Sequence, residues 1–450
     1  MSNFISNKSK PENISLIALC LTPISFVTGS LMANAFTVIL FLVCILNGQR
    51  NFFLDFLRKY KILILIFLSI VILNILFSET QFYSFTKLTS FFRFFLFSLS
   101  IIILLDFVKN NVSKYAQIYL AFIFFLVIDS YIQLFFGYDI FGFSYNYDYE
   151  RITGPFKDEM IIGNYLLYFG FLCIALINQF NKITIFYNFI LFLMIVITVL
   201  ISGERTPFIS FIYFFSILFI ISSKKKFVFT TSILLVIFSI GVISFSDRLS
   251  EKYRISSIPK LTDIESKTFR PKKSDLEKNQ NKINKETSFL NELNISFRSN
   301  QYVGHYSRAI DIFRENYIFG TGFKSYRKVC GAYETLHQPN QYGTDGNRRL
   351  TCSIHPHNYH LEILSDTGIT GYFTFLSLIF YTIYLFFKKK LYRNFSACIL
   401  FSLIITYIFP LKPAGSFFST NSAFIFWFLI GHFFYFSKSL DFNPSSSRKF

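Results

Sequence analysis

Long apolar runs, separated by short polar stretches, dominate the chain. Most runs hold roughly 17–25 residues, the length that crosses the hydrocarbon core of a bilayer as an α-helix. Twelve spans are predicted, at 14–29, 31–47, 62–78, 88–105, 115–135, 160–178, 184–202, 206–223, 227–246, 367–387, 394–410 and 421–437. The first run is expected to be a retained helix rather than a cleaved signal peptide, because more spans follow it. The pattern predicts an all-α integral membrane protein with about 12 transmembrane helices.

One polar segment, 247–366, interrupts this series between the ninth and tenth spans. It is far longer than an ordinary connection between helices. Its part 256–296 is rich in Lys, Glu, Asn and Ser and is expected to be flexible. The chain is therefore divided into an N-terminal membrane bundle of about nine spans (1–246), this large loop, a C-terminal bundle of about three spans (367–437) and a tail (438–450).

The basic residues indicate how the bundle is oriented. Only 16% of residues are charged, yet the net charge is +18. Nineteen of the Lys and Arg residues fall in the termini and the loops on one side of the predicted spans, and five fall in the short loops on the other side, at Lys87, Arg151, Lys157, Arg205 and Lys412. This bias predicts that both termini are cytoplasmic and that the large loop is extracytoplasmic, which in a bacterial inner membrane means periplasmic. A basic surface against anionic lipid explains the charge without nucleic acid.

Two of the six cysteines, Cys330 and Cys352, fall in the large loop. An oxidising compartment allows a disulfide between them, and two free thiols are the alternative. The other four lie in predicted spans, where a small packing role is expected.

Three of the six histidines, His355, His357 and His360, lie where the large loop meets the tenth span. Pro356 suits the first turn of a helix and Gly368 suits its end, so His357, His360 and Glu362 are expected on one short helix. Three interpretations remain open. The cluster, with Glu362, supplies zinc ligands; it is a capped helix start with ordinary interfacial histidines; or one histidine is a general base.

Arg205 lies in a short Ser-Gly-Glu-Arg-Thr turn between two spans. It either reaches toward the membrane surface or pairs with Glu204, or it binds a phosphate or pyrophosphate, for which a guanidinium is well suited. Inside the predicted spans lie two charged residues, Arg93 and Asp129. A charge within the bilayer has a high free-energy cost, which suggests that these residues have a function. Asp129 shares a helix face with Gln133, and either lines a cavity or pairs with Arg93.

Several motifs together resemble the O-antigen ligase and O-antigen polymerase superfamily. They are the Ser-Gly-Glu-Arg-Thr turn at 202–206, the large loop, Gly-Thr-Gly-Phe at 320–323 and His-Pro-His-Asn at 355–358. His357-Asn358, followed after nine residues by Gly368-Ile-Thr-Gly371, is similar to the His-Asn-x9-Gly-x-x-Gly pattern of lipopolysaccharide O-antigen ligases. The segment 151–156 with Glu159 resembles a loop of polymerase-like members. These motifs do not separate ligase from polymerase.

The resemblance implies a glycosyltransferase-C-like bundle in the cell inner membrane that acts in lipopolysaccharide biosynthesis. The implied donor is a glycan on undecaprenyl pyrophosphate, and the implied acceptor is lipid A–core for a ligase or a growing glycan for a polymerase. No cofactor or metal is implied. His357 is the expected base, with His355 next, and Arg205 is the expected cation for the leaving pyrophosphate. Substrate binding is expected from further residues, namely Arg308 or Arg298 as the second cation, with Arg151, Glu159, Asp129, Asn358 and Glu362.

Two other functional classes fit part of this pattern. A transporter of lipid-linked glycans suits twelve spans, but such proteins tend to have two related halves with broken helices, and no such symmetry is visible. A structural assembly protein leaves Arg205 and the histidines unexplained.

Overall fold

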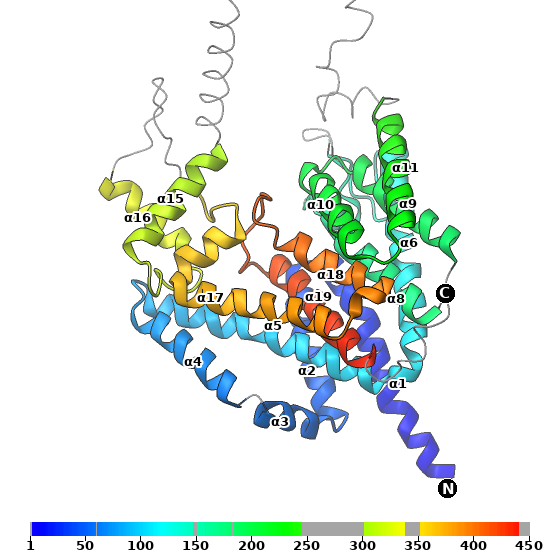
Figure 1. Ribbon diagram of the computed structural model, residues 1–450, viewed down its shortest axis with the longest axis horizontal. Coiled ribbons are helices and arrows are strands. Elements are labelled where there is room, and N and C mark those ends of the chain that lie inside the picture. Colours follow the sequence, from blue (N-terminus) through cyan, green and yellow to red (C-terminus); the bar gives the residue numbers. More distant parts are fainter. Residues whose placement is uncertain are drawn as a thin grey trace, which may run out of the picture.

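The computed structural model describes residues 2–59, 61–146, 151–157, 159–181, 184–244, 301–337 and 352–440 (Figure 1). Within these ranges the chain is helical, and β-structure is limited to two isolated bridges, Tyr138 with Ser144 and Asn146 with Arg151. The helices are α1 (Ser2–Val27), α2 (Ser30–Leu46), α3 (Arg50–Lys59), α4 (Lys61–Leu76), α5 (Gln81–Phe107), α6 (Val112–Phe136), α7 (Ile162–Tyr165), the π-helical turn η3 (Leu166–Gly170), α8 (Phe171–Asn181), α9 (Ile185–Ile201), α10 (Arg205–Ile221), α11 (Lys225–Ser244), α15 (Gln301–Glu315), α16 (Tyr326–His337), α17 (Tyr359–Lys388), α18 (Phe395–Tyr407) and α19 (Thr420–Ser439).

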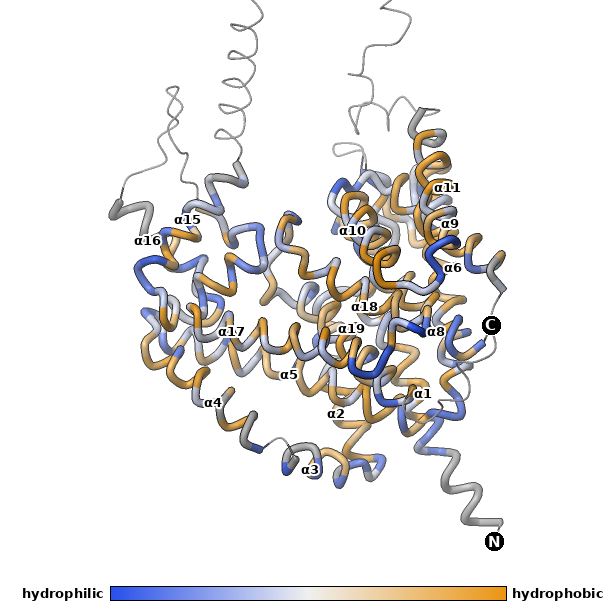
Figure 2. The backbone as a smooth tube through the Cα atoms, viewed as in Figure 1, coloured by the Kyte–Doolittle hydropathy of each residue, from blue (hydrophilic) through white to orange (hydrophobic). Residues whose placement is uncertain are grey.

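Every predicted span coincides with one of these helices or, at 160–178, with the α7–η3–α8 series. In the described part of the chain, four helical stretches are long and apolar enough to cross a membrane, at Gln81–Phe107, Lys109–Phe136, Ile162–Asn181 and Tyr359–Lys388, and several apolar helices are shorter. Figure 2 shows apolar residues covering these helices, whereas polar residues gather in the connections. The all-α membrane fold is thus confirmed, and the count of twelve spans and the extent of the large loop remain predictions.

Aromatic side chains fill the core. α5 packs against α19 and α2, and α18 packs against α8, α10 and α19. Phe97 of α5 lies 4.7 Å from Phe424 of α19, and Phe386 of α17 stacks on Phe401 of α18 at 4.0 Å, both measured between ring centroids. A Cβ atom on Gly431 would lie 3.0 Å from the Ser98 carbonyl oxygen, so a glycine lets α5 and α19 approach closely. Such close packing holds membrane helices together, because lipid tails are as apolar as the side chains.

A pair of glycine-rich segments joins α15 and α16 to α17. α17 contains a kink at Gly368, whose φ is 62° and ψ −169°. The segment 317–322 pairs with the backbone at this kink: Thr321 N donates to Ser365 O at 3.0 Å and Ile369 N donates to Tyr317 O at 2.9 Å. Gly320 has φ +71°, and a Cβ there would lie 2.5 Å from the Gly368 amide nitrogen. The two glycines therefore permit a backbone contact that side chains would prevent.

This contact fixes the position of α15 and α16, which lie together beside the kinked start of α17 (Figure 1). Their own small core consists of Ala309, Ile312, Tyr326, Val329 and Cys330. α15 ends at Glu315, before Gly320.

We predict that Gly320→Ala destabilises the protein by about 2–3 kcal/mol, because the new Cβ would be strained by the positive φ and would collide with the α17 backbone. The measurement is the unfolding temperature of the detergent-purified protein. Gly331→Ala in α16 is the matched control: nothing lies within 4 Å of its Cβ position, and alanine favours a helix. Equal unfolding temperatures for the two variants would contradict this assignment.

Candidate active site

The histidine loop, residues 352–358, precedes α17 and does not belong to it. Asn358 is the N-cap of α17, and its Oδ1 accepts hydrogen bonds from His360 N at 3.0 Å and Leu361 N at 3.2 Å. His357 has φ 56°, a left-handed conformation that cannot continue into a helix. The prediction that His357 shares a helix with His360 and Glu362 is therefore wrong. An asparagine cap satisfies the first amides of the helix better than Pro356 could start one.

The start of α17 binds the loop that joins α18 to α19, residues 408–419, called the α18–α19 loop below. Asn358 Nδ2 donates to Pro410 O at 2.7 Å, and Ala414 N donates to His357 O at 2.8 Å. One turn further along, the buried Glu362 accepts hydrogen bonds from Ser416 Oγ and from Phe417 N, each at 2.5 Å. These contacts attach the α18–α19 loop to the histidine loop and to the first turn of α17.

A cavity of about 410 Å³ lies between the two loops and the helix ends around them. Its walls come from segments far apart in the sequence: the histidine loop, the α18–α19 loop and the ends or starts of several helices. The lining residues are Phe26, Ile161, Asn164, Tyr165, Tyr168, Thr206, Tyr302, His355, His357, Tyr359, Tyr407, Lys412, Pro413, Ala414, Gly415, Ser419, Asn421, Ser422 and Ile425. The cavity combines an aromatic surface with a few polar groups, as small-molecule sites do.

Two of the three clustered histidines face this cavity. The rings of His355 and His357 lie 4.3 Å apart between centroids, and His305 of α15 lies 5.1 Å from His357. Burial, helped by the neighbouring imidazoles, lowers the pKa of His355 to about 4 and lowers that of His357 from its ordinary value. Both imidazoles are therefore neutral near pH 7, the form that accepts a proton.

The third histidine is bound elsewhere. His360 contacts Tyr372 OH through Nδ1 at 2.9 Å and the Ile408 carbonyl through Nε2 at 2.6 Å. Since Glu362 also binds the α18–α19 loop, the four side chains of the zinc hypothesis do not converge. Among the described residues, no group of three or more His, Cys, Asp or Glu side chains is placed to hold a metal ion.

Arg205 opens α10, and the next residue, Thr206, lines the cavity. The preceding Glu204 is turned inward: its Oε1 accepts from Gly163 N at 2.5 Å, and its side chain is buried. A Cβ on Gly163 would lie 2.8 Å from Ser202 Oγ, so this close approach requires a glycine. Burial raises the pKa of Glu204 to about 7 against the opposing effects of the Gly163 amide and Arg151. The turn thus attaches the start of α10 to α7 and leaves Arg205 exposed.

The two polar residues on one face of α6 hold the loop that follows this helix. Asp129 Oδ1 accepts from Ile140 N at 2.8 Å, and Gln133 Oε1 accepts from Thr153 N at 2.9 Å and Gly154 N at 2.8 Å. Asp129 does not line the cavity described above. Arg93 instead donates to Asn34 Oδ1 at 2.7 Å. The α6 pair therefore orders the segment that carries Arg151 and Glu159.

The remaining predicted residues lie around this centre. Glu159 accepts from Asn421 Nδ2, a cavity-lining group, at 3.1 Å. Arg308 is buried in α15, one turn beyond His305. Arg298, its competitor as the second cation, lies outside the described residues.

Lys412 also lines the cavity, although the sequence motifs do not predict it as a site residue. It is 4% exposed, and its Nζ donates to Tyr168 OH at 2.8 Å. The signal was present in the sequence, because Lys412 is one of the five basic residues on the side where the charge bias does not require them. Arg205 is another of these five residues.

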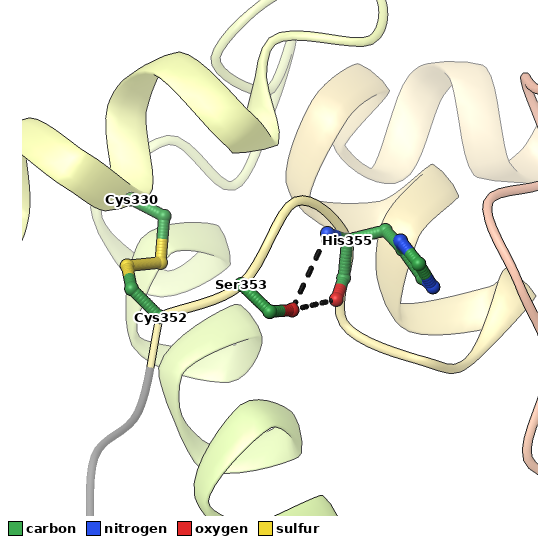
Figure 3. Close-up of a disulfide and its surroundings, with 4 residues drawn as sticks. All are labelled: Cys330, Cys352, Ser353 and His355. Atoms are coloured by element: carbon green, nitrogen blue, oxygen red, sulfur yellow. Dashed lines mark hydrogen bonds between the residues drawn. A yellow bond between two sulfur atoms is a disulfide. The ribbon is translucent and has the colours of Figure 1, made fainter. Parts of the chain in front are cut away.

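A disulfide joins Cys330 of α16 to Cys352, with the two Cα atoms 5.7 Å apart (Figure 3). It attaches the histidine loop to α16 three residues before His355. Ser353 continues this attachment, since its Oγ contacts both the amide and the carbonyl of His355. Figure 3 shows the imidazole of His355 pointing away from the disulfide, which leaves the ring directed toward the cavity.

Comparison with known proteins identifies a region that contains part of this site. Residues 189–376 match the family described as O-antigen ligase. A search of the curated proteins gives no match. The matched region includes Arg205, α15 and the histidine loop, and it confirms the resemblance inferred from the sequence motifs. The chain is therefore a membrane protein in which residues 189–376 are similar to the O-antigen ligase family, and this similarity supports a ligase- or polymerase-type function in surface polysaccharide assembly.

Proposed function

We propose that this protein transfers a glycan from undecaprenyl pyrophosphate to an acceptor sugar hydroxyl at the periplasmic face of the inner membrane, as an O-antigen ligase does. One observation carries the proposal: a single cavity is lined by two neutral imidazoles and by the first turn of α10, which Arg205 opens. These are the two chemical requirements of the reaction, a base for the attacking hydroxyl and a cation for the departing pyrophosphate.

His357 is the proposed base. Its imidazole takes the proton of the acceptor hydroxyl as the oxygen attacks the anomeric carbon, and the bond from that carbon to the pyrophosphate oxygen breaks. A single displacement of this kind inverts the anomeric configuration. The conformation of His357 is well defined, because its carbonyl is bound by Ala414 and its ring lies among His355, His305 and Tyr302. His355, with its ring in the same cavity, is the second candidate.

Arg205 is the proposed partner of the leaving group. A guanidinium at the N-terminus of a 17-residue helix adds its charge to the positive end of the helix dipole. Arg308 is proposed as the second cation, since it shares α15 with His305. Neither role requires a metal ion.

The other predicted binding residues divide by their contacts. Glu159 and Arg151 remain proposed sugar or phosphate contacts, because Glu159 binds cavity-lining Asn421. The side chains of Asn358, Glu362 and Asp129 already form hydrogen bonds with backbone amides or a carbonyl. Their proposed role is therefore to position the loops around the site.

The alternative within the family is an O-antigen polymerase, whose acceptor is another lipid-linked glycan. Deletion of the gene distinguishes the two activities. A ligase deletion should remove long-chain polysaccharide from lipid A–core and leave it on the lipid carrier. A core that still carries a single repeat unit would contradict the ligase assignment and support polymerisation.

In a reconstituted assay with lipid-linked glycan and acceptor, we predict that Arg205→Ala and His357→Ala each lower transfer at least about 100-fold, the usual scale for loss of a charge-stabilising group or a general base. Product is measured by gel shift of the acceptor. Arg314→Ala, which removes only an exposed pair with Asp311, is the control. Full transfer by membrane-inserted His357→Ala would disprove the base assignment, and movement of the lipid-linked glycan across vesicles without covalent product would indicate a transporter.

The pH dependence tests the imidazole separately. A base acts in its deprotonated form, and the pKa of His357 lies below its ordinary value of 6.5. We therefore predict that kcat/KM does not decrease as pH falls from 7 to 6.5 and decreases only below 6.5. A decrease that begins above pH 7 would assign the base to another group.

A further inference from the structure

Lys412 occupies an aromatic enclosure inside the cavity. Its Nζ lies 5.0 Å from the ring centroid of Tyr407, 5.3 Å from that of Tyr168 and 5.8 Å from that of Tyr359. Tyr168 OH accepts the single hydrogen bond that its ammonium makes to the described residues. Three rings and one hydroxyl stabilise a cation by cation–π attraction, but they carry no negative charge.

A buried ammonium without a carboxylate is energetically unfavourable, because its lost hydration is only partly replaced. Burial lowers the pKa of Lys412 to about 7, and no charge from a described residue offsets this effect. Lysines are almost never fully buried unless they are paired. The missing partner of Lys412 is therefore an anion that enters the cavity.

Hydrogen bonds fix the backbone on both sides of Lys412. Lys412 N donates to Phe409 O at 3.3 Å, Pro413 follows directly, and Ala414 is bound to the histidine loop. Glu362 and Asn358 hold the α18–α19 loop on either side of this position. The backbone that carries the Lys412 amino group is thus held in place before any ligand arrives, which favours binding.

Lys412 is the only lysine or arginine among the described residues that line the cavity, whereas Arg205 is exposed at the start of α10. We propose that Lys412 binds a phosphate oxygen of the donor pyrophosphate inside this cavity. This inference rests on the proposed function. Lys412, in the α18–α19 loop, contacts the pyrophosphate inside the cavity, and Arg205 contacts it from the exposed start of α10.

Binding should be linked to a proton. The titratable groups that share the cavity with Lys412 are His355, His357, Tyr168, Tyr302, Tyr359 and Tyr407. Both histidines are neutral between pH 7 and 8, because burial lowers their pKa values. At pH 8 Lys412 is mostly neutral, and a phosphate oxygen beside it restores its proton.

The experiment is calorimetric titration of the nanodisc-reconstituted protein with geranylgeranyl pyrophosphate, at pH 6.5 and 8, in buffers of different ionisation enthalpy. We expect Lys412→Met to weaken binding at least about tenfold, the scale of one hydrogen bond to a charged group. It should also abolish the uptake of most of one proton seen at pH 8. Lys412→Arg should retain much of the affinity and lose the proton uptake, because arginine stays protonated.

The control is Lys87→Met, which removes a lysine that also lies over a tyrosine ring, 5.1 Å from the Tyr83 centroid, but outside the cavity. If Lys412→Met is folded and binds like wild type with the same proton uptake, Lys412 is a structural residue and the inference fails, while the proposed function stands. If wild type binds no prenyl pyrophosphate, the donor assignment itself fails. A parallel titration with glucosamine 1-phosphate identifies the source of the anion: dependence on Lys412 for that ligand alone would assign the lysine to the acceptor and overturn the proposal.

Discussion

The cavity depends on the attachment of the α18–α19 loop to the first turn of α17. Asn358 uses one end of its amide to cap the helix and the other to bind Pro410. Glu362 binds two groups of the same loop from one turn further along the helix. A buried carboxylate is tolerated only when hydrogen bonds satisfy it, so this loop and this helix stabilise each other. Without these contacts neither His357 nor Lys412 would have a fixed position.

Much of the fold could be predicted because helices that cross a bilayer need long apolar runs. These runs located the membrane helices in the sequence. The start of α17 could not be located in the same way. Pro356 and Asn358 both favour a helix start, and only the left-handed backbone of His357 decides between them. Local sequence does not reveal that conformation.

The site was predicted in part for a related reason. Arg205 and the histidines lie in recognisable motifs, whereas Lys412 stands between two prolines with no motif around it. Its role depends on three tyrosines from η3, α17 and α18, which only the folded chain brings together. Similarly, the sequence predicts a helix end at Gly368, but it does not reveal that the backbone there contacts Gly320. Properties that depend on distant segments require the structure.

Burial limits the charge inside the cavity at neutral pH. It keeps the histidines neutral and lowers the pKa of Lys412 to about 7, so this lysine is only partly protonated. An anionic ligand would change this state by favouring protonation of the lysine. The site therefore acquires its full positive charge only with substrate present, which limits the cost of keeping a charge away from water.

The disulfide between Cys330 and Cys352 has a consequence for the evolution of the chain. It attaches the histidine loop to α16 by a covalent bond at the first residue of the loop, so the loop does not depend on hydrogen bonds alone to stay beside this helix. Substitutions elsewhere in the large loop can therefore accumulate without loss of this attachment, as long as both cysteines are kept.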